Sequence, residues 1–297
     1  MVYVIKKQIF IYSALSIVCL SQASSCLARQ KPNIVFILTD YIGYGDFGCY
    51  GAKAISTPNI DSLASHGVRF THAYAPASTS SPTRYALLTG EYAFRKKVGI
   101  MRGDAPLSID LNMNNLPKQL KSEGYKTGIV GKWHLGLGPK GAKVDFNKHI
   151  DYGMEDVGFE YSYIFPATND RVPTIYIEND NTVNLDTNDP IRVSYTHKIG
   201  TDPTGKENSE LLKLKPFRGY NGTIVDSISR LGWMTGGYSA RWTDETIADT
   251  FLSKAEQFIS KNSEHPFSYI MLVIMHMNHV WRVSIRKVKV MLVYMGT

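Results

Sequence analysis

Residues 80–90 are the part of the chain best suited to chemistry, and they read Ser-Ser-Pro-Thr-Arg-Tyr-Ala-Leu-Leu-Thr-Gly. A serine just ahead of a proline that opens such a run predicts an N-capped helix beginning at Pro82. The first turn of a helix offers free N–H groups and the positive end of the helix dipole. The pattern therefore predicts that an anion is stabilised beside Ser80.

Lys132 and His134 form a second candidate pair, inside residues 124–136, which read Gly-Tyr-Lys-Thr-Gly-Ile-Val-Gly-Lys-Trp-His-Leu-Gly. Side chains two residues apart in an extended segment project to the same side, so the two could bind one anion together. Taken alone, a Lys-Trp-His triplet is more often a surface turn. The presence of the first run favours the functional interpretation.

Both runs resemble signature segments of the type I sulfatases, the first being Cys or Ser, any residue, Pro, Ser or Thr, Arg, then Leu-Thr-Gly. The resemblance extends over residues 31–279. It implies an α/β fold of the alkaline-phosphatase-like type, with a mixed sheet flanked by helices. It also implies that Ser80 is converted to formylglycine and that Arg84 holds it. Lys132 and His134 are then expected to bind sulfate and move protons.

The implied modification explains why a sulfatase does not use a plain serine. A serine that attacked sulfur would form a stable sulfate ester and stall. An aldehyde hydrate has two hydroxyls on one carbon, so one can take the sulfuryl group while deprotonation of the other expels sulfate. Because residue 80 is Ser and not Cys, the resemblance implies a partner, the radical-type maturase that oxidises serine.

A third match follows a predicted strand at residues 267–274, where residues 276–280 read His-Met-Asn-His-Val. Similar sulfatases carry a His-x-x-His after this strand. The resemblance places His279 on the sulfate or on the leaving oxygen, with His276 nearby, and imidazole suits proton transfer at neutral pH. The alternative is a pair of surface histidines.

Asp40 follows the predicted strand of residues 33–38, at the edge of a parallel sheet where ligands bind. By the resemblance, Asp40 and the oxygen of residue 80 bind Ca²⁺, a cation that prefers oxygen ligands. The family has a second aspartate where this chain has Tyr41, and a neutral phenol is a poor substitute for a carboxylate. Asp46, in a Gly-Tyr-Gly-Asp run, is expected to be a turn residue.

Residues 169–171, Asn-Asp-Arg, are a candidate substrate-binding cluster. Asn169 and Arg171 could contact hydroxyls or a carboxylate of a sugar. A solvated loop with an internal ion pair is an equally good interpretation.

Helix and strand signals alternate along the rest of the chain, as expected for a parallel or mixed sheet. A helix is expected from Pro58 to Gly67, with Ile60, Leu63 and Ala64 on one face. Another begins near Pro117 and precedes a strand at residues 125–130. Thr243 is the expected N-cap of a third helix, ending at Ile259; its apolar face comprises Ile247, Phe251, Ala255 and Phe258.

Between residues 145 and 237 the pattern loosens, with frequent Asn, Asp, Gly, Pro and Thr. Short strands are expected at residues 161–165 and 174–177. We interpret this stretch as an insertion of loops and hairpins over the rim of the sheet, and not as a separate domain.

Residues 1–28 are expected to be a signal peptide, in which Lys6 and Lys7 precede an apolar stretch and small residues follow. Cleavage after Ala23 or Ala28 would give an exported protein, periplasmic or secreted. Residues 23–26, Ala-Ser-Ser-Cys, are also a loose lipobox that would leave a lipid anchor on Cys26, and ordinary secretion is favoured over it.

Net charge and cysteine content say little about partners. Six cations stand in the signal or the final stretch: Lys6, Lys7, Arg282, Arg286, Lys287 and Lys289. Removing them from the net charge of +7 leaves +1, so no nucleic-acid partner is expected. Of three cysteines, only Cys49 lies beyond the signal region, where it is expected to be a small buried apolar residue.

The catalytic domain is expected to span residues 29–297 and to be incomplete, corresponding to the N-terminal half of a sulfatase. Residues 282–297 form an atypical basic and apolar tail. Their codons can be chosen so that a one-base shift from Lys287 gives Gly-Lys-Ser-Asp-Ala-Gly-Val-Tyr-Gly-Asp, which resembles the way sulfatases continue. A frameshift is therefore our hypothesis for the tail, and the gene sequence tests it.

Together these features predict a sulfuric ester hydrolase of the arylsulfatase type that acts on a sulfated carbohydrate or an aryl sulfate. The alternative is a non-catalytic remnant that at most binds sulfated glycans. A phosphoryl-transfer enzyme on the same scaffold is disfavoured, because the Ser-x-Pro-Thr-Arg run belongs to sulfatases.

Overall fold

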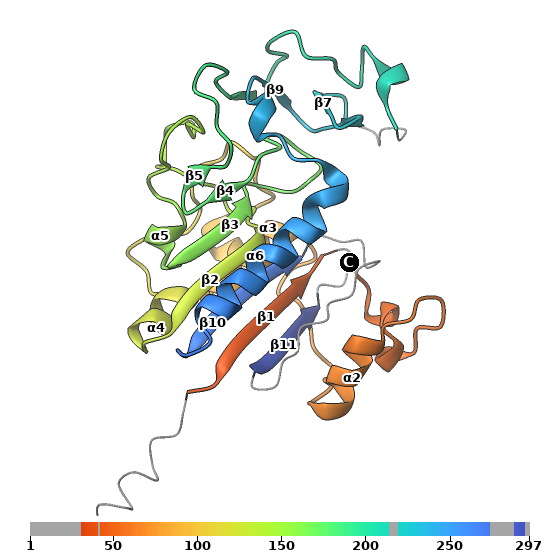
Figure 1. Ribbon diagram of the computed structural model, residues 1–297, viewed down its shortest axis with the longest axis vertical. Coiled ribbons are helices and arrows are strands. Elements are labelled where there is room, and N and C mark those ends of the chain that lie inside the picture. The colour runs from red at the N-terminus through yellow and green to blue at the C-terminus, as the bar shows by residue number, and fades with distance from the viewer. Residues whose placement is uncertain (1–30, 41, 214–218, 274–287, 295–297) are drawn as a thin grey trace, which may run out of the picture. The chain divides into compact units, whose positions relative to one another are not determined.

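A seven-stranded sheet forms the centre of the unit that begins at Asn33 (Figure 1). The computed structural model describes residues 31–40, 42–213, 219–273 and 288–294. The strand order is β11-β1-β10-β2-β3-β4-β5, parallel from β11 to β3 and antiparallel for the last two pairs. The strands are β1 Asn33–Thr39, β2 Lys126–Lys132, β3 Tyr161–Phe165, β4 Ile177–Glu178, β5 Asn181–Thr182, β10 Phe267–Val273 and β11 Val288–Tyr294.

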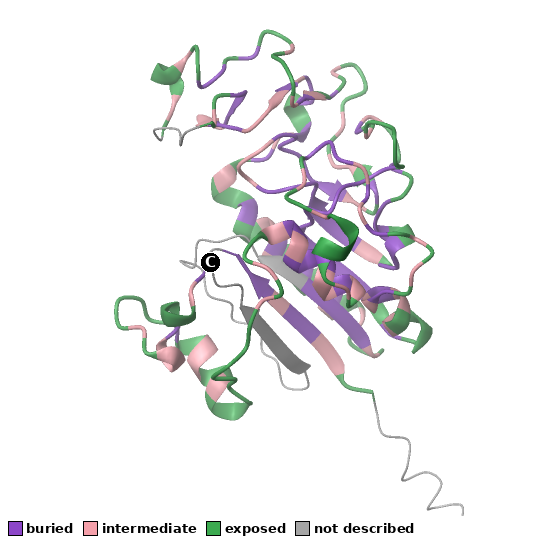
Figure 2. Cartoon of the chain, turned by 180° about the vertical axis from the view of Figure 1, so that it is seen from behind, coloured by how far each residue is buried: buried purple, intermediate pink, exposed green. Residues whose placement is uncertain are grey.

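Successive residues of β1 enter the cores on opposite faces of the sheet, as the pleat of a strand requires. Val35 packs with the aromatic residues of α6 (Ile247–Lys261), whereas Phe36 and Leu38 pack with Tyr85 of α3 (Ser80–Thr89). Figure 2 shows the central strands of the sheet largely buried where the structure describes their side chains. The mixed sheet with helices on both faces confirms the expected α/β class.

Helix α6 packs on the sheet through Ile247, Phe251, Ala255 and Phe258, the four residues that sequence periodicity assigned to its apolar face. A 3-10 turn, Asp244–Thr246, precedes it, so the α-helix begins four residues after Thr243. Gly128 of β2 lies beneath Phe258, where a Cβ would come within 2.7 Å of the ring. Glycine is therefore required for helix and strand to approach this closely.

The remaining helices are short: α2 Pro58–His66, α4 Leu116–Ser122 and α5 Met154–Val157. Helix α2 has the expected bounds, but the described residues bury none of its side chains, and Leu63 is exposed. The helix is thus confirmed, while its apolar face is not buried by the described residues.

The stretch between residues 145 and 237 forms hairpins, as expected. Strands β4 and β5 extend the main sheet, while β6 (Arg192–Ser194) pairs with β9 (Trp233–Thr235), and β7 (Ile224–Val225) pairs with β8 (Ile228–Ser229). The strand predicted at residues 174–177 is confirmed only at Ile177. Ile175 instead makes an isolated bridge to Arg241.

Two smaller expectations have different outcomes, and the tail adds a strand. Asp46 is a turn residue, ending the 3-10 turn Tyr44–Asp46, and its carboxylate accepts from the Gly43 amide. Cys49 was expected to be buried, but it is only half-buried. Part of the atypical tail, Val288–Tyr294, forms strand β11 beside β1.

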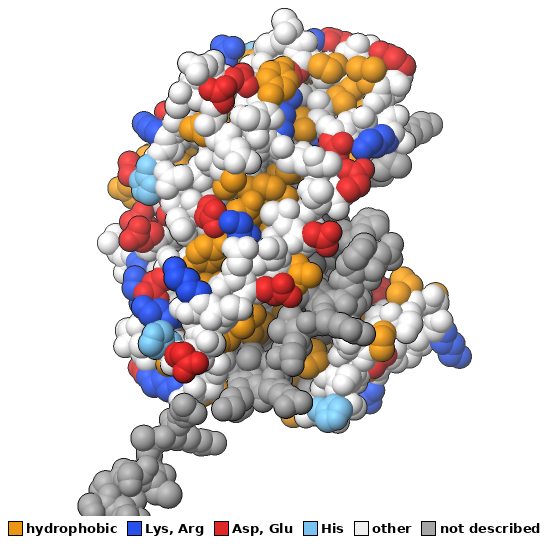
Figure 3. Space-filling view, in the orientation of Figure 1, with side chains coloured by type: hydrophobic (Ala, Val, Ile, Leu, Met, Phe, Trp, Pro, Cys, Tyr) orange, Lys and Arg blue, Asp and Glu red, His pale blue; other side chains and the backbone are white. Residues whose placement is uncertain are grey.

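No helix among the described residues is both long and apolar enough to span a bilayer. On the face shown in Figure 3, the basic and acidic side chains of the described residues are interspersed and do not gather by sign. That distribution agrees with the modest charge expected for the central part of the chain.

Candidate active site

Ser80 is the first residue of α3, two residues earlier than the sequence predicted. The expected start at Pro82 is wrong because Thr79, in extended conformation, is the N-cap, and Thr83 N–H already donates to its carbonyl. The Ser81 hydroxyl anchors this first turn by donating to the carbonyl of His134 (2.7 Å). Ser80 is half-buried at a helix N-terminus, a position that favours bound anions.

Arg84 lies one turn further along α3 and is almost fully buried. Its guanidinium donates to Ser80 Oγ (Nε, 2.9 Å) and to the carbonyl of Lys132 (Nη1, 2.7 Å), and it lies 3.4 Å from Asp40 Oδ2. The fork of an arginine can make these three contacts at once, which a lysine cannot. Arg84 therefore joins the helix start to the ends of β1 and β2.

Lys132, the last residue of β2, forms a buried ion pair with Asp40, which directly follows β1. Burial, with the nearby Arg84 charge, lowers the pKa of Lys132 to about 8, against the opposing attraction of Asp40. One carboxylate thus faces two cations beside Ser80. The structure therefore brings Asp40 and Lys132 together at the carboxyl ends of β1 and β2.

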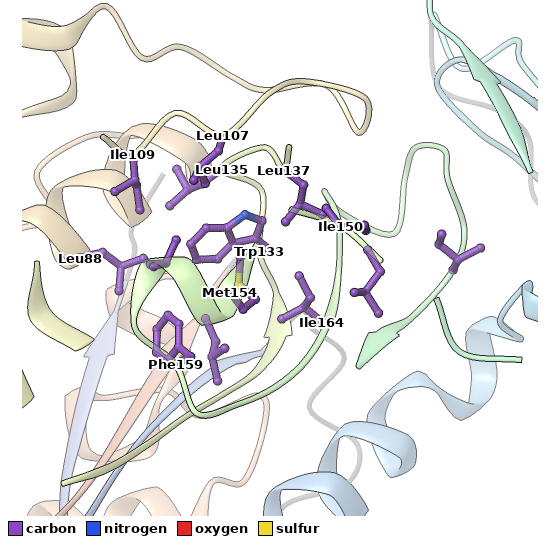
Figure 4. Close-up of a cluster of buried hydrophobic side chains, with 14 of the residues drawn as sticks. Leu88, Leu107, Ile109, Trp133, Leu135, Leu137, Ile150, Met154, Phe159 and Ile164 are labelled. Atoms are coloured by element: carbon purple, nitrogen blue, oxygen red, sulfur yellow. The ribbon is translucent and has the colours of Figure 1, made fainter. Parts of the chain in front are cut away.

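Trp133 fixes the segment between Lys132 and His134. Its indole is buried in the large apolar cluster shown in Figure 4, among Leu88, Leu107 and Met154, and its N–H donates to the carbonyl of Gly136. The chain turns at His134, whose φ of 62° lies in the left-handed region. The two polar residues therefore flank a buried anchor in a turn, and are not simply alternating members of one extended strand.

His134 is a neutral hydrogen-bond acceptor in this site. Its Nε2 donates to the carbonyl of Met101 (2.8 Å), because a carbonyl can only accept. Its Nδ1 is buried and has no hydrogen-bond partner among the described residues. Burial, reinforced by the charges of Lys132 and Arg171, lowers the pKa of His134 to about 2. The free Nδ1 lone pair can therefore accept a hydrogen bond, and His134 stays uncharged at neutral pH.

Arg171 reaches the same backbone group as His134. Its Nη1 donates to the carbonyl of Met101 (3.2 Å), and its Nε donates to Asp170 Oδ1 (2.8 Å). The internal ion pair that the sequence allowed is thus present, yet Arg171 also lies beside the site. The Asn169 carbonyl accepts from the buried Arg230, and the Asn169 side chain accepts from Thr168 Oγ1.

The structure thus brings together most of the residues that the sequence singled out: Asp40, Ser80, Arg84, Lys132, His134 and Arg171. Three further positions lie outside the described residues: Tyr41, His276 and His279. Their predicted roles stay predictions.

A family model described as Sulfatase matches residues 32–284. The chain belongs to the sulfatase family. It is 54% identical, over 239 residues, to an N-acetylgalactosamine-6-O-sulfatase of Bacteroides thetaiotaomicron, a match that covers 80% of this chain and 47% of that protein. It is 44% identical to bovine arylsulfatase A over 131 residues, or 43% of this chain and 26% of the relative.

A solved structure from the same bacterium, described under the metabolism of multiple glycosaminoglycans, superposes on this sulfatase chain with a TM-score of 0.81. The two are 52% identical, and the match covers 86% of this chain and 52% of the other. This likeness confirms the alkaline-phosphatase-like fold expected from the sequence. The chain spans about half the length of the bacterial sulfatase that it matches.

Calcium, which the sulfatase family generally uses, does not fit the described residues by themselves. Calcium needs about six to eight oxygen ligands. In the described part of the chain, no group of three or more His, Cys, Asp or Glu side chains could hold a metal ion. Asp40 is engaged instead by Lys132 and Arg84. The expected pair of Asp40 and the residue 80 oxygen is thus only a fragment of a calcium site.

Two structural residues of the sulfatase site escaped the sequence interpretation. Ser81 is fully buried and joins α3 to the His134 turn, and the Met101 amide donates to its hydroxyl (3.1 Å). Met101 then accepts from His134 and Arg171 through its carbonyl. Ser81 occupies the position that the Ser-x-Pro-Thr-Arg run leaves free, so the run gave no reason to single it out. Nothing in the sequence indicates Met101, because it acts only through its backbone.

Proposed function

We propose that the protein carrying this chain hydrolyses sulfate esters of a carbohydrate, with formylglycine made from Ser80 as its nucleophile. The observation that carries the proposal is the buried Arg84 guanidinium, which joins Ser80 Oγ, the Lys132 carbonyl and Asp40 at the start of α3. The hydrate of an aldehyde at this position supplies one hydroxyl to take the sulfuryl group and a second whose deprotonation releases sulfate.

The chain's own residues prepare the site for this chemistry. Arg84 orients the residue 80 side chain, and the Lys132 ammonium and the helix N-terminus offset the charge of a sulfate. His134, neutral and with a free Nδ1, accepts a hydrogen bond from a hydroxyl of the hydrate and so orients it. This refines its expected role, because the Nε2 proton is committed to Met101 and cannot be donated to sulfate.

The leaving sugar oxygen needs a proton donor, which the described residues do not identify. We assign this role to His279, which also contacts the sulfate, on the strength of the sequence match at residues 276–280. Calcium belongs to the proposal through Asp40 and the residue 80 oxygen, together with ligands outside the described residues. The maturase that oxidises serine is the implied partner in making the nucleophile.

The substrate we propose is a sulfated carbohydrate, and Asn169 and Arg171 are the side chains that contact its sugar. The support is the N-acetylgalactosamine-6-O-sulfatase relative, together with the position of Arg171 beside His134. The signal-like residues 1–28 support export to the periplasm or to the outside of the cell. A sulfated carbohydrate would be encountered in either place.

A fluorogenic aryl sulfate tests the proposal directly. The protein is co-expressed with a maturase that oxidises serine, assayed with added Ca²⁺, and compared with a Ser80→Ala variant. We expect turnover by the parent and none by the variant. If the parent shows no turnover but a sulfated glycan still binds, the non-catalytic remnant is the better account.

A further inference from the structure

Asp170 and Arg171 form a bidentate pair at the border of the site. Arg171 donates through Nε to Oδ1 (2.8 Å) and through Nη2 to Oδ2 (3.1 Å). Its third nitrogen reaches the Met101 carbonyl, which His134 also uses. The orientation of this guanidinium toward a substrate therefore depends on where the Asp170 carboxylate is held.

Tyr220 supplies a further hydrogen bond to that carboxylate. Its hydroxyl donates to Asp170 Oδ2 at 2.7 Å, across fifty residues of sequence. Tyr220 is itself held, because its carbonyl accepts from Ser229 Oγ (2.6 Å). The Asp170 backbone is tied to the same segment by the Leu231 amide, which donates to its carbonyl (2.9 Å). The loop of residues 169–171 thus rests on residues 220–231.

The tyrosine does what a bidentate ion pair cannot do alone. If only Arg171 bound the Asp170 carboxylate, the carboxylate and the guanidinium could rotate together. The Tyr220 hydroxyl, which comes from another segment, fixes the plane of both groups. Although burial alone would raise the pKa of Asp170, the hydrogen bonds from Arg171 and Tyr220 hold it below its ordinary value. The acceptor that Tyr220 needs is therefore charged at neutral pH.

We propose that Tyr220 is a positioning residue for sugar recognition, whose hydroxyl fixes the Asp170 carboxylate and thereby aims Arg171 at the sugar of the substrate. This inference rests on the proposed function. It separates two tasks within one site. The residues around Ser80 engage the sulfate, and the Tyr220–Asp170–Arg171 group engages the sugar that carries it.

The chain offers a matched control in a second Tyr–Asp–Arg group. Tyr238 donates to Asp202 Oδ1 (2.9 Å), which also accepts from Arg241 Nη1 (2.9 Å). Arg241 continues to the carbonyl of Gly236 and not to Met101. Removing either tyrosine hydroxyl deletes one hydrogen bond to a paired aspartate, but only Tyr220 is joined to the site.

The test compares Tyr220→Phe with Tyr238→Phe in the full-length protein. Each change is also placed on a Ser80→Ala background, and the Kd of N-acetylgalactosamine 6-sulfate is measured by calorimetry. We expect Tyr220→Phe to raise this Kd about threefold to tenfold, the range that corresponds to the loss of one ordinary hydrogen bond, because the lost bond acts on the sugar only through Asp170 and Arg171. Tyr238→Phe should leave it unchanged, and the KM of an aryl sulfate should stay the same in both variants.

The inference is overturned if Tyr220→Phe and Tyr238→Phe change the Kd equally, or if the KM of the aryl sulfate rises with the Kd of the sulfated sugar. It is also overturned if the sugar does not bind at all. Absence of turnover in the parent protein would contradict the proposed function alone, because the Kd comparison does not depend on catalysis.

Discussion

Arg84 shows how much of this site depends on a single residue type. Its side chain serves Ser80, the Lys132 carbonyl and Asp40 at once, and it does so while almost fully buried. Each contact joins a different element, so the guanidinium holds the helix start against two strand ends. A single ammonium group could satisfy only part of this set.

Replacing Arg84 by Lys should therefore remove orientation while keeping the charge. We expect kcat/KM for an aryl sulfate to fall about 100- to 1,000-fold, the range seen when one preorganised donor is lost at a charged reaction centre. Steady-state kinetics measure the fall, with a thermal melt as the control for folding. Activity within a factor of three of the parent would contradict the role assigned to Arg84.

The burial of His134 predicts that the stability of the fold depends on pH. Its folded-state pKa is lowered to about 2 by burial, whereas an unfolded histidine titrates near its ordinary value. Below about pH 6.5 the unfolded chain binds a proton that the folded chain does not, so stability falls by up to about 1.4 kcal/mol per pH unit from this residue.

Chemical denaturation at pH 7 and pH 5.5 checks this contribution. His134→Asn should lose less stability than the parent over that interval, because the titrating group is gone while all other groups remain. Equal losses in the two proteins would show that His134 is not held neutral by the fold.

At the scale of elements, the site depends on two helices packed on opposite faces of one sheet. Helix α6 carries no proposed catalytic side chain, yet it packs on β2 and β10, and β2 ends in Lys132. Phe258 contributes most visibly, because it stacks near Tyr161 and Tyr269 and lies directly over Gly128.

Phe258→Ala should destabilise the fold by about 3 to 5 kcal/mol, the usual cost of a cavity left by a buried phenylalanine. The matched control is Phe94→Ala, since Phe94 is 72% exposed. That change should stay within about 0.5 kcal/mol. Urea unfolding curves for the two variants test the contrast, and similar losses from both would contradict the packing described for α6.

Local patterns predicted those parts of the fold whose physics is local. Strand β3 has the predicted bounds, and the four apolar residues of α6 follow from the helical period. The start of α3 was misplaced because a proline is tolerated throughout the first turn of a helix, where the N–H groups have no intrahelical partner, and Pro82 stands third in α3. The exposed face of α2 could not be foreseen, because periodicity shows which residues share a face and not what covers it.

The residues of the site likewise fall into those that the sequence could indicate and those that it could not. Ser80, Arg84, Lys132 and His134 stand in runs long enough to resemble a family, so their types and spacing could be interpreted. Tyr220 could not, because it reaches Asp170 from fifty residues away. The turn at His134 was missed as well, since a left-handed histidine is an exception to strand alternation.

At the scale of the whole molecule, the main sheet is accompanied by a segment of hairpins that supports the loop of residues 169–171. Residues 145–237 extend the main sheet at β4 and β5, and their later part carries Tyr220 and Arg230 beneath the loop of residues 169–171. The expected insertion is therefore a structural support for the proposed sugar contacts, and not only a cover for the rim of the sheet.

Export is the prediction that belongs to this scale. Expressed in a bacterium, the protein should be recovered outside the cytoplasm without its first 23 or 28 residues, because residues 1–28 have the composition of a signal peptide. Mass spectrometry of the mature N-terminus distinguishes the two cleavage positions from a lipid on Cys26. An intact N-terminus in the cytoplasm would contradict the prediction.

The most direct measurement of the central claim is the mass of the peptide that contains Ser80, taken from protein co-expressed with a maturase that oxidises serine. The account predicts a fraction of this peptide lighter by two hydrogen atoms and reactive toward a hydrazine that captures aldehydes. A peptide that keeps the mass of unmodified serine throughout, in a cell where a known serine-type sulfatase is converted, would contradict it.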